Sequence, residues 1–284
     1  QVFSLKKRSV TEDGVGFRYE LDGKQTFLSP EVSMGIQQSL GSDIAMVFDE
    51  CLPADSDYQT VRESIGRTAR WAQRSKDAHI RTDQSLFGII QGAMFPDLRE
   101  QSAEQILSIG FDGYAVGGLA VGEEPEQLYQ MTEVGAALLP EDRPRYLMGV
   151  GRPQDLVTCV QAGIDMFDCV IPTRHARGGL LYTFQGRVRV TDKRYRRDGY
   201  SLDTSCHCYA CSNFSRAYIH HLFRVGEVLG TTLATIHNLY FFERWMEKIR
   251  AAIIDGTLNE VADEMRALYP ERDTQSAADR SSGD

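Results

Sequence analysis

The chain has 284 residues, 42% hydrophobic side chains and a formal net charge of −9. No stretch reaches the roughly 18 apolar residues that a membrane-spanning helix needs, so we expect no membrane partner. The acidic average argues against a polyanionic partner for the chain as a whole.

Strand and helix patterns alternate through the first two-thirds of the chain. Short apolar runs predict strands at residues 43–48, 86–90, 113–116, 145–148 and 164–167. Helical spacing of apolar residues predicts helices at residues 58–72, 98–109, 125–138 and 153–160. Five successive β-α units without a reversal predict an α/β fold with a parallel sheet, which is either doubly wound or most of a (β/α)8 TIM-type barrel.

Polar residues and glycines follow each predicted strand. In both folds, ligands bind beyond the carboxyl ends of the strands, so these positions are candidates for a site. In chain order they are Asp49-Glu50-Cys51, Gln91-Gly92, Gly117-Gly118-Leu119, Gly149-Val150-Gly151 and Asp168.

Asp168 ends the fifth predicted strand and has several chemical interpretations. It could bind a metal, act as a base, cap the next turn, or attack an anomeric carbon as a nucleophile. A metal role lacks partners, because no histidine stands at the other strand ends. A nucleophilic carboxylate would form a covalent glycosyl ester and would need a second acid, and Asp49 is the other aspartate at a strand end.

Asp49 and Gln91 together suggest recognition of a base. A carboxylate and a carboxamide match the donor and acceptor groups on the edge of a guanine-like ring. Backbone N–H groups of Gly118 and Leu119 could bind the ring carbonyl, since a glycine lets a flat ring approach the backbone. Met148 could pack against the ring face, or it could be an ordinary core residue.

The alternation stops after Gly179. Residues 180–190 predict a hairpin with its turn at Gln185-Gly186, and helices are expected at residues 215–225 and 244–268. We therefore expect an incomplete βα barrel at residues 1–179, a zinc-binding subdomain with C-terminal helices at 180–273, and a disordered tail at 274–284.

Three cysteines, Cys206, Cys208 and Cys211, crowd into six residues. Zn²⁺ takes four ligands in a tetrahedron, so a fourth must come from elsewhere. The candidates are His207, His220, His221 and His237, and a turn at residues 226–230 favours the return of the chain at His237. A reduced, metal-free cluster is the alternative. Four protein ligands would make the ion structural, and this use of cysteine is typical of a cytoplasmic protein.

A basic strip runs from Arg174 to Asp198. It holds eight basic and two acidic side chains, a local charge of +6. A solvated loop has the same composition, but a basic strip on an acidic body also suits a localised contact with nucleic-acid phosphates.

Long motifs in this chain resemble the bacterial-type tRNA-guanine transglycosylase family in order, from Gln1 to about Leu268. They are D-E-C-L-P, I-I-Q-G, Y-A-V-G-G-L-A-V-G-E, Y-L-M-G-V-G-R-P, F-D-C-V-I-P-T-R, and C-H-C-x-x-C with S-R-A-Y-I-H-H-L. The family exchanges guanine at the wobble position of certain tRNAs for a 7-deazaguanine, 7-aminomethyl-7-deazaguanine in bacteria, on the way to queuosine. The resemblance implies a homodimer with one structural Zn²⁺ per subunit.

The resemblance also implies roles for individual residues. Asp168 becomes the nucleophile on ribose C1′, and His237 becomes the fourth zinc ligand. The base is expected to lie among Asp49, Gln91, Gly118, Leu119 and Met148. The tRNA anticodon loop is expected to contact Gly149, Val150, Gly151, Arg152, Pro153, Gln154, Asp155, Thr173, Arg174, His175, Ala176 and Arg177. Extrusion of the nucleotide would bring its sugar to Asp168.

The start of the chain departs from the family pattern. The family's general acid/base aspartate lies in D-S-G-G-F-Q, immediately before Q-V-x-S-L, and this chain begins at Q-V-F-S-L. An N-terminal sheet and three of eight barrel strands would precede it. We therefore expect residues 1–284 alone to be inactive and poorly stable, with exposed strand edges. The competing interpretations are a catalytically silent subunit and a zinc-stabilised RNA-binding module.

Overall fold

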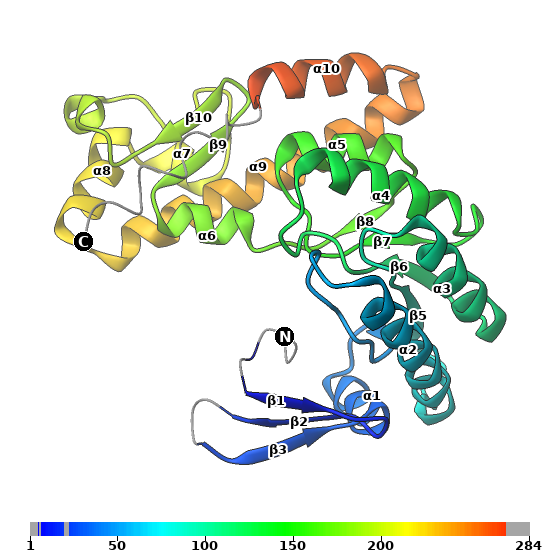
Figure 1. Ribbon diagram of the computed structural model, residues 1–284. Helices are drawn as coiled ribbons and strands as arrows, with labels where there is room; N and C mark the ends of the chain where they lie inside the picture. Colours follow the sequence, from blue (N-terminus) through cyan, green and yellow to red (C-terminus); the bar gives the residue numbers. More distant parts are fainter. Residues whose placement is uncertain (1–4, 6, 20–22, 271–284) are drawn as a thin grey trace. The chain divides into compact units, whose positions relative to one another are not determined.

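The computed structural model describes residues 5, 7–19 and 23–270, and these form two compact units (Figure 1). Unit 1 runs to Val150 and also includes Ala162–Asp168. Unit 2 contains Gly151–Gln161 and the chain from Cys169 onward. The tail expected to be disordered, residues 274–284, lies outside the described residues.

Unit 1 is built on a five-stranded parallel sheet, which confirms the α/β prediction. The strands follow chain order: β4 (Ile44–Met46), β5 (Ser85–Ile90), β6 (Gly113–Val116), β7 (Arg145–Leu147) and β8 (Met166–Phe167). Every neighbouring pair is parallel. Within the described residues, β4 and β8 do not pair with each other, so the five strands form an open sheet, and its place in a truncated (β/α)8 barrel stays a prediction.

Helices cover one face of this sheet, with α2, α3 and α4 side by side (Figure 1). The helices of unit 1 are α1 (Pro30–Leu40), α2 (Tyr58–Ala78), α3 (Pro96–Ile109) and α4 (Pro125–Ala137). Three of them begin with a proline, whose fixed φ suits the first helical position. The Asp57 side chain caps α2 by accepting a hydrogen bond from the Thr60 amide at 3.0 Å.

The strand register aligns the residues that follow the strands. Ile90 pairs with Val116, Val116 with Leu147, and Leu147 with Phe167. The next residue on each strand is Gln91, Gly117, Met148 and Asp168, respectively. Because neighbouring parallel strands stay in register, these four residues form one row at the carboxyl edge of the sheet.

A small antiparallel sheet precedes the parallel one, and the sequence reasoning missed it together with α1. Its strands are β1 (Arg8–Val10), β2 (Val15–Arg18) and β3 (Gln25–Leu28). Val15 packs with Phe48 and Trp71, and the Trp71 indole N–H donates to the Glu12 carbonyl at 2.7 Å. Strands of three or four residues contain too little alternation to be recognised in a sequence.

Unit 2 combines helices with one hairpin. Its elements are α5 (Pro153–Gln161), α6 (Ile171–Arg177), β9 (Leu180–Thr183), β10 (Gly186–Arg189), the 3₁₀ helix η2 (Lys193–Arg197), α7 (Tyr209–Asn213), α8 (Arg216–Val225), α9 (Val228–Asp255) and α10 (Leu258–Leu268). The hairpin turn falls at residues 184–185, one residue earlier than expected.

The long helix α9 organises unit 2 through buried polar side chains. The Asn238 amide group donates to the Pro172 and Leu180 carbonyls at 2.9 and 3.1 Å, and its oxygen accepts from the Tyr182 amide. The Trp245 indole N–H donates to the Pro153 carbonyl at 3.0 Å. These contacts hold the starts of α5 and α6 and the strand β9 against one helix.

None of the described helices is both long enough and apolar enough to cross a membrane.

Candidate active site and metal centre

Asp168 is an exposed carboxylate that is held by one of its two oxygens. Oδ1 accepts hydrogen bonds from the Tyr146 hydroxyl at 2.6 Å and from the Gly149 amide at 2.9 Å. Burial of Tyr146, together with its bond to Asp168, raises the pKa of Tyr146, so this hydroxyl stays protonated and donates. Within the described part of the chain, Oδ2 accepts no hydrogen bond and is therefore available to a ligand.

Asp49 and Gln91 lie in direct contact at the same edge of the sheet. The Gln91 side-chain amide donates to Asp49 Oδ2 at 2.6 Å. Burial raises the pKa of Asp49 to about 6, although the bond from Gln91 opposes that shift. At neutral pH the pair therefore presents a carboxylate and a carboxamide, the combination expected for the edge of a guanine-like base.

Two glycines make room for the Gln91 side chain. A Cβ on Gly117 would lie 2.5 Å from Gln91 Nε2, and a Cβ on Gly118 would lie 2.5 Å from Gln91 Oε1. Gly118 also has φ of +67°, where other residues are strained. Glycine at both positions therefore lets the loop after β6 lie directly against the Asp49–Gln91 pair.

The other two residues expected at the base are Leu119 and Met148. Leu119 is buried and Met148 is half-buried. Met148 nevertheless occupies the row between Gly117 and Asp168. All six residues expected around the base and the sugar belong to unit 1.

The residues expected to contact RNA divide into exposed and buried positions. Gly149, Arg152, Arg174 and Arg177 are exposed, whereas Thr173 and His175 are half-buried. The remaining positions are buried: Val150, Gly151, Pro153, Gln154, Asp155 and Ala176. The exposed arginines of the second stretch lie on the short helix α6, which Asn238 anchors through Pro172.

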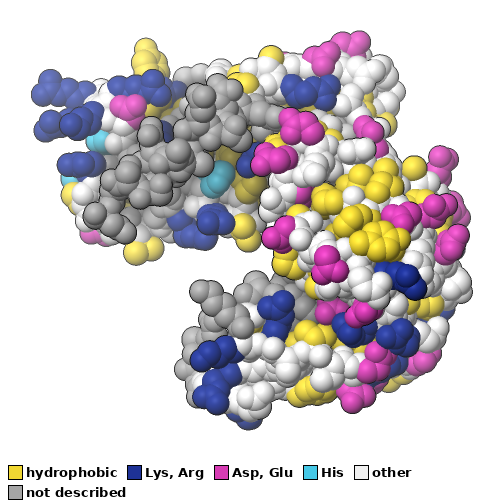
Figure 2. Space-filling view, viewed as in Figure 1, with side chains coloured by type: hydrophobic (Ala, Val, Ile, Leu, Met, Phe, Trp, Pro, Cys, Tyr) yellow, Lys and Arg dark blue, Asp and Glu magenta, His cyan; other side chains and the backbone are white. Residues whose placement is uncertain are grey.

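The basic strip continues along unit 2 beyond α6. The 3₁₀ helix η2 has the sequence K-R-Y-R-R, in which only Tyr195 is buried. Figure 2 shows Lys and Arg side chains gathered over the end of unit 2 that carries the hairpin and α8. Arg187, Arg189 and the basic residues of η2 belong to the strip that the sequence predicted.

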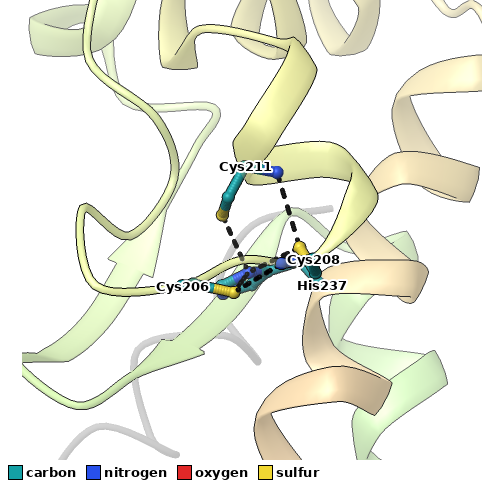
Figure 3. A group of neighbouring side chains, drawn as sticks. All are labelled: Cys206, Cys208, Cys211 and His237. Atoms are coloured by element: carbon teal, nitrogen blue, oxygen red, sulfur yellow. Dashed lines mark hydrogen bonds between the residues drawn. The ribbon is translucent and has the colours of Figure 1, made fainter.

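Cys206, Cys208, Cys211 and His237 come together in unit 2, as the resemblance implied (Figure 3). His237 Nδ1 lies 3.6, 3.7 and 3.3 Å from the three sulfurs in chain order. A tetrahedral Zn²⁺ with ordinary Zn–S and Zn–N bonds separates such donors by about 3.6 Å. The four donors therefore fit one tetrahedral metal ion.

Surrounding contacts orient this group. His237 Nε2 lies 2.9 Å from the Tyr182 carbonyl, so Nε2 carries the proton and Nδ1 faces the sulfurs. Backbone amides of Cys208 and Cys211 donate to the sulfurs of Cys206 and Cys208, at 3.5 and 3.4 Å. His220 instead lies 2.8 Å from the Val190 carbonyl and takes no part in the group.

Four residues that shape these sites were not identified from the sequence. They are Tyr146, which holds Asp168; Asn238 and Trp245, which anchor α6 and α5; and Arg99, which is fully buried behind the loops after β5 and β6. Of these four, only Arg99 could have been noticed in the sequence, because the helix dipole disfavours a basic residue in the first turn of a helix.

Known proteins match this chain over nearly its whole length. The family model described as "Queuine tRNA-ribosyltransferase" matches residues 1–271. A protein of that name from Halothermothrix orenii is 54% identical over 270 residues, which cover 95% of this chain and 72% of the relative. Its namesake from Solidesulfovibrio magneticus is 53% identical over 274 residues, covering 95% and 74%. The one from Shewanella piezotolerans is 52% identical over 267 residues, covering 93% and 71%. With this match added to the row at the sheet edge and to the Cys₃His group, the chain belongs to the queuine tRNA-ribosyltransferase family.

Proposed function

We propose that this chain carries the nucleophile and the base pocket of a tRNA-guanine transglycosylase, which exchanges the wobble guanine of tRNA for 7-aminomethyl-7-deazaguanine. The observation that carries this proposal is the placement of Asp168 in the same edge row as Gln91, with Gln91 bonded to Asp49. Names of relatives support the reaction class, and the geometry supports the assignment of residues.

In the first displacement, Asp168 Oδ2 attacks C1′ of the extruded ribose. The bond from C1′ to guanine N9 breaks, guanine leaves with the electron pair and takes up a proton, and a covalent aspartyl–ribose ester remains. The Tyr146 hydroxyl and the Gly149 amide bind Oδ1 and so orient Oδ2 toward the sugar. These two donors also moderate the charge on the carboxylate, which makes it a competent leaving group in the second step.

In the second displacement, the incoming 7-deazaguanine loses a proton, and its ring nitrogen attacks C1′. The ester bond breaks, and Asp168 regains its carboxylate. Asp49 and Gln91 bind the edge of each base in turn, and the amides of Gly118 and Leu119 bind its carbonyl oxygen. The resemblance assigns the proton transfers to an aspartate in a D-S-G-G-F-Q motif, which residues 1–284 do not contain, so no residue of this chain is assigned to them.

The remaining features support tRNA binding and the stability of unit 2. Arg174 and Arg177 on α6 are proposed to contact tRNA phosphates, because both are exposed cations and arginine binds phosphate oxygens without reading the base. The Cys₃His group is proposed to hold one Zn²⁺, which would cross-link the α7 segment to α9 and leave no open position for substrate. A homodimer and a cytoplasmic location belong to the same proposal.

A covalent-adduct assay tests the assignment of Asp168. It uses the longest natural polypeptide that contains residues 1–284, incubated with unmodified tRNA and resolved on a denaturing gel. We expect a protein–RNA adduct that Asp168→Asn abolishes. The matched control is Asp165→Asn, because Asp165 precedes the same strand and accepts from the Arg145 amide at 2.8 Å. An adduct that persists in Asp168→Asn would overturn the assignment, and absence of guanine exchange in the unmodified protein would overturn the proposed function.

A further inference from the structure

Arg99 is a fully buried basic side chain in unit 1. It lies on α3 and is fully buried, and burial lowers its pKa to about 10, so it remains a cation at neutral pH. It also lies in the first turn of α3, where the helix dipole disfavours positive charge. Attraction to Glu123 and hydrogen bonds to two backbone carbonyls offset these costs, so the position of Arg99 depends on specific partners.

The contacts of Arg99 are directed at the two loops that form the base pocket. Its Nε donates to the Ala93 carbonyl at 2.9 Å, and one terminal nitrogen donates to the Gly117 carbonyl at 3.2 Å. The other terminal nitrogen is buried and has no hydrogen-bond partner within the described residues. Gly92, in the loop after β5, packs directly against Arg99, because a Cβ on Gly92 would lie 2.6 Å from the Arg99 backbone nitrogen. Arg99 therefore ties the loop after β5 to the loop after β6.

The Gly117 carbonyl belongs to the same peptide group as the Gly118 N–H. Gly118 lies directly against the base-pocket side chain Gln91, because a Cβ on Gly118 would lie 2.5 Å from Gln91 Oε1. A cation that binds the oxygen of a peptide group withdraws electron density from it and strengthens its N–H as a donor. One hydrogen bond thus connects Arg99 to the peptide group that lies against Gln91.

We propose that Arg99 is a positioning residue for base recognition, which holds and polarises the Gly117–Gly118 peptide group so that the Gly118 N–H binds the carbonyl oxygen of a guanine-type base more strongly. This inference rests on the proposed function, because it requires a base to bind beside Asp49 and Gln91. It adds a residue that touches neither the base nor the sugar. The same interaction would favour departure of guanine, since negative charge develops on the carbonyl oxygen as the glycosidic bond breaks.

A comparison of two free bases tests this role. Guanine and 6-thioguanine present the same ring N–H and amino group to Asp49 and Gln91, but sulfur is the weaker hydrogen-bond acceptor. Binding of both bases is measured by calorimetry on the longest natural polypeptide that contains this chain. We expect the unmodified protein to prefer guanine, and Arg99→Met to weaken guanine binding by about three- to tenfold while 6-thioguanine binding changes by less than about twofold.

The matched control is Arg145→Met. Arg145 also donates to two backbone carbonyls, those of Leu139 and Pro140 at 2.6 and 3.1 Å, but it lies at the amino end of β7. We expect this variant to lose stability without a change in the ratio of the two affinities.

Several outcomes would overturn the inference. If Arg99→Met weakens both bases equally, Arg99 has a purely structural role. Should that variant not fold, Arg99→Gln decides in the same assay, and an unchanged affinity ratio rejects the inference. An unmodified protein that binds both bases equally also rejects it, whatever the variants do. A protein that binds neither base refutes the proposed function instead.

Discussion

Gly118→Ala adds a single methyl group, but we expect it to disrupt the proposed base pocket. The new methyl carbon would lie 2.5 Å from Gln91 Oε1, whereas ordinary contacts begin at 3.4 Å. Gln91 is buried and bonded to Asp49 at 2.6 Å, so it cannot move aside and keep this bond. The substitution therefore breaks the pair that is proposed to read the base.

The magnitude follows from two separable costs. The φ of +67° at Gly118 costs an alanine about 1–2 kcal/mol. Displacement of Gln91 adds the loss of a hydrogen bond to a charged group, about 1.5–3 kcal/mol. The second cost corresponds to about a 10- to 150-fold loss of base affinity if the pocket must restore the pair on binding.

Gly41→Ala separates these costs because Gly41 has nearly the same φ, +69°, in the same unit. A Cβ there meets only the end of the Arg81 side chain, at 3.4 Å. Denaturant unfolding and guanine binding are measured for both variants at pH 8. We expect Gly118→Ala to be the less stable by about 1.5–3 kcal/mol and to bind guanine weakly, while Gly41→Ala binds normally. Equal stability of the two variants, with normal binding in both, would refute the predicted collision.

Three further outcomes follow from the structure. His237→Ala should release one metal ion per chain, measured by elemental analysis, and destabilise unit 2; His220→Ala, which changes a buried histidine outside the metal group, should retain the metal. Burial raises the pKa of Asp49 to about 6, well above the value of about 3.9 in an unfolded chain. Between about pH 4 and pH 6, Asp49 is therefore protonated in the folded chain and ionised in the unfolded chain. The contribution of Asp49 to folding stability therefore falls as the pH rises from about 4 to about 6, while guanine affinity rises with a midpoint near pH 6. Asp49→Asn should remove both pH dependences. A pH-independent guanine affinity in the unmodified protein would contradict the carboxylate role. Tyr146→Phe should slow formation of the tRNA adduct by about tenfold, because Asp168 loses one of two orienting bonds, but leave free guanine binding unchanged; an equal loss of both would show that the pocket itself had collapsed.

Local patterns were sufficient for the main architecture. Alternating apolar runs and helical spacing predicted the five parallel strands and the helices between them, because in a parallel sheet with helical crossovers each element has its own period. The same order of elements predicted that the residues after each strand would share one edge. Three cysteines in six residues predicted a metal group, since thiolates so close together have few other uses in a reduced protein.

Other features depend on contacts between residues far apart in the chain. Tyr146 reaches Asp168 only because β7 and β8 pair, and Arg99 bonds to Gly117 only because the loops after β5 and β6 are neighbours. Spacing favoured His237 for the metal group, but its approach to the cysteines depends on how α9 packs against the hairpin. Hydrophobic periodicity records which face of an element is buried, whereas the partner of a buried polar group is set by strand register and helix packing, which no local pattern encodes.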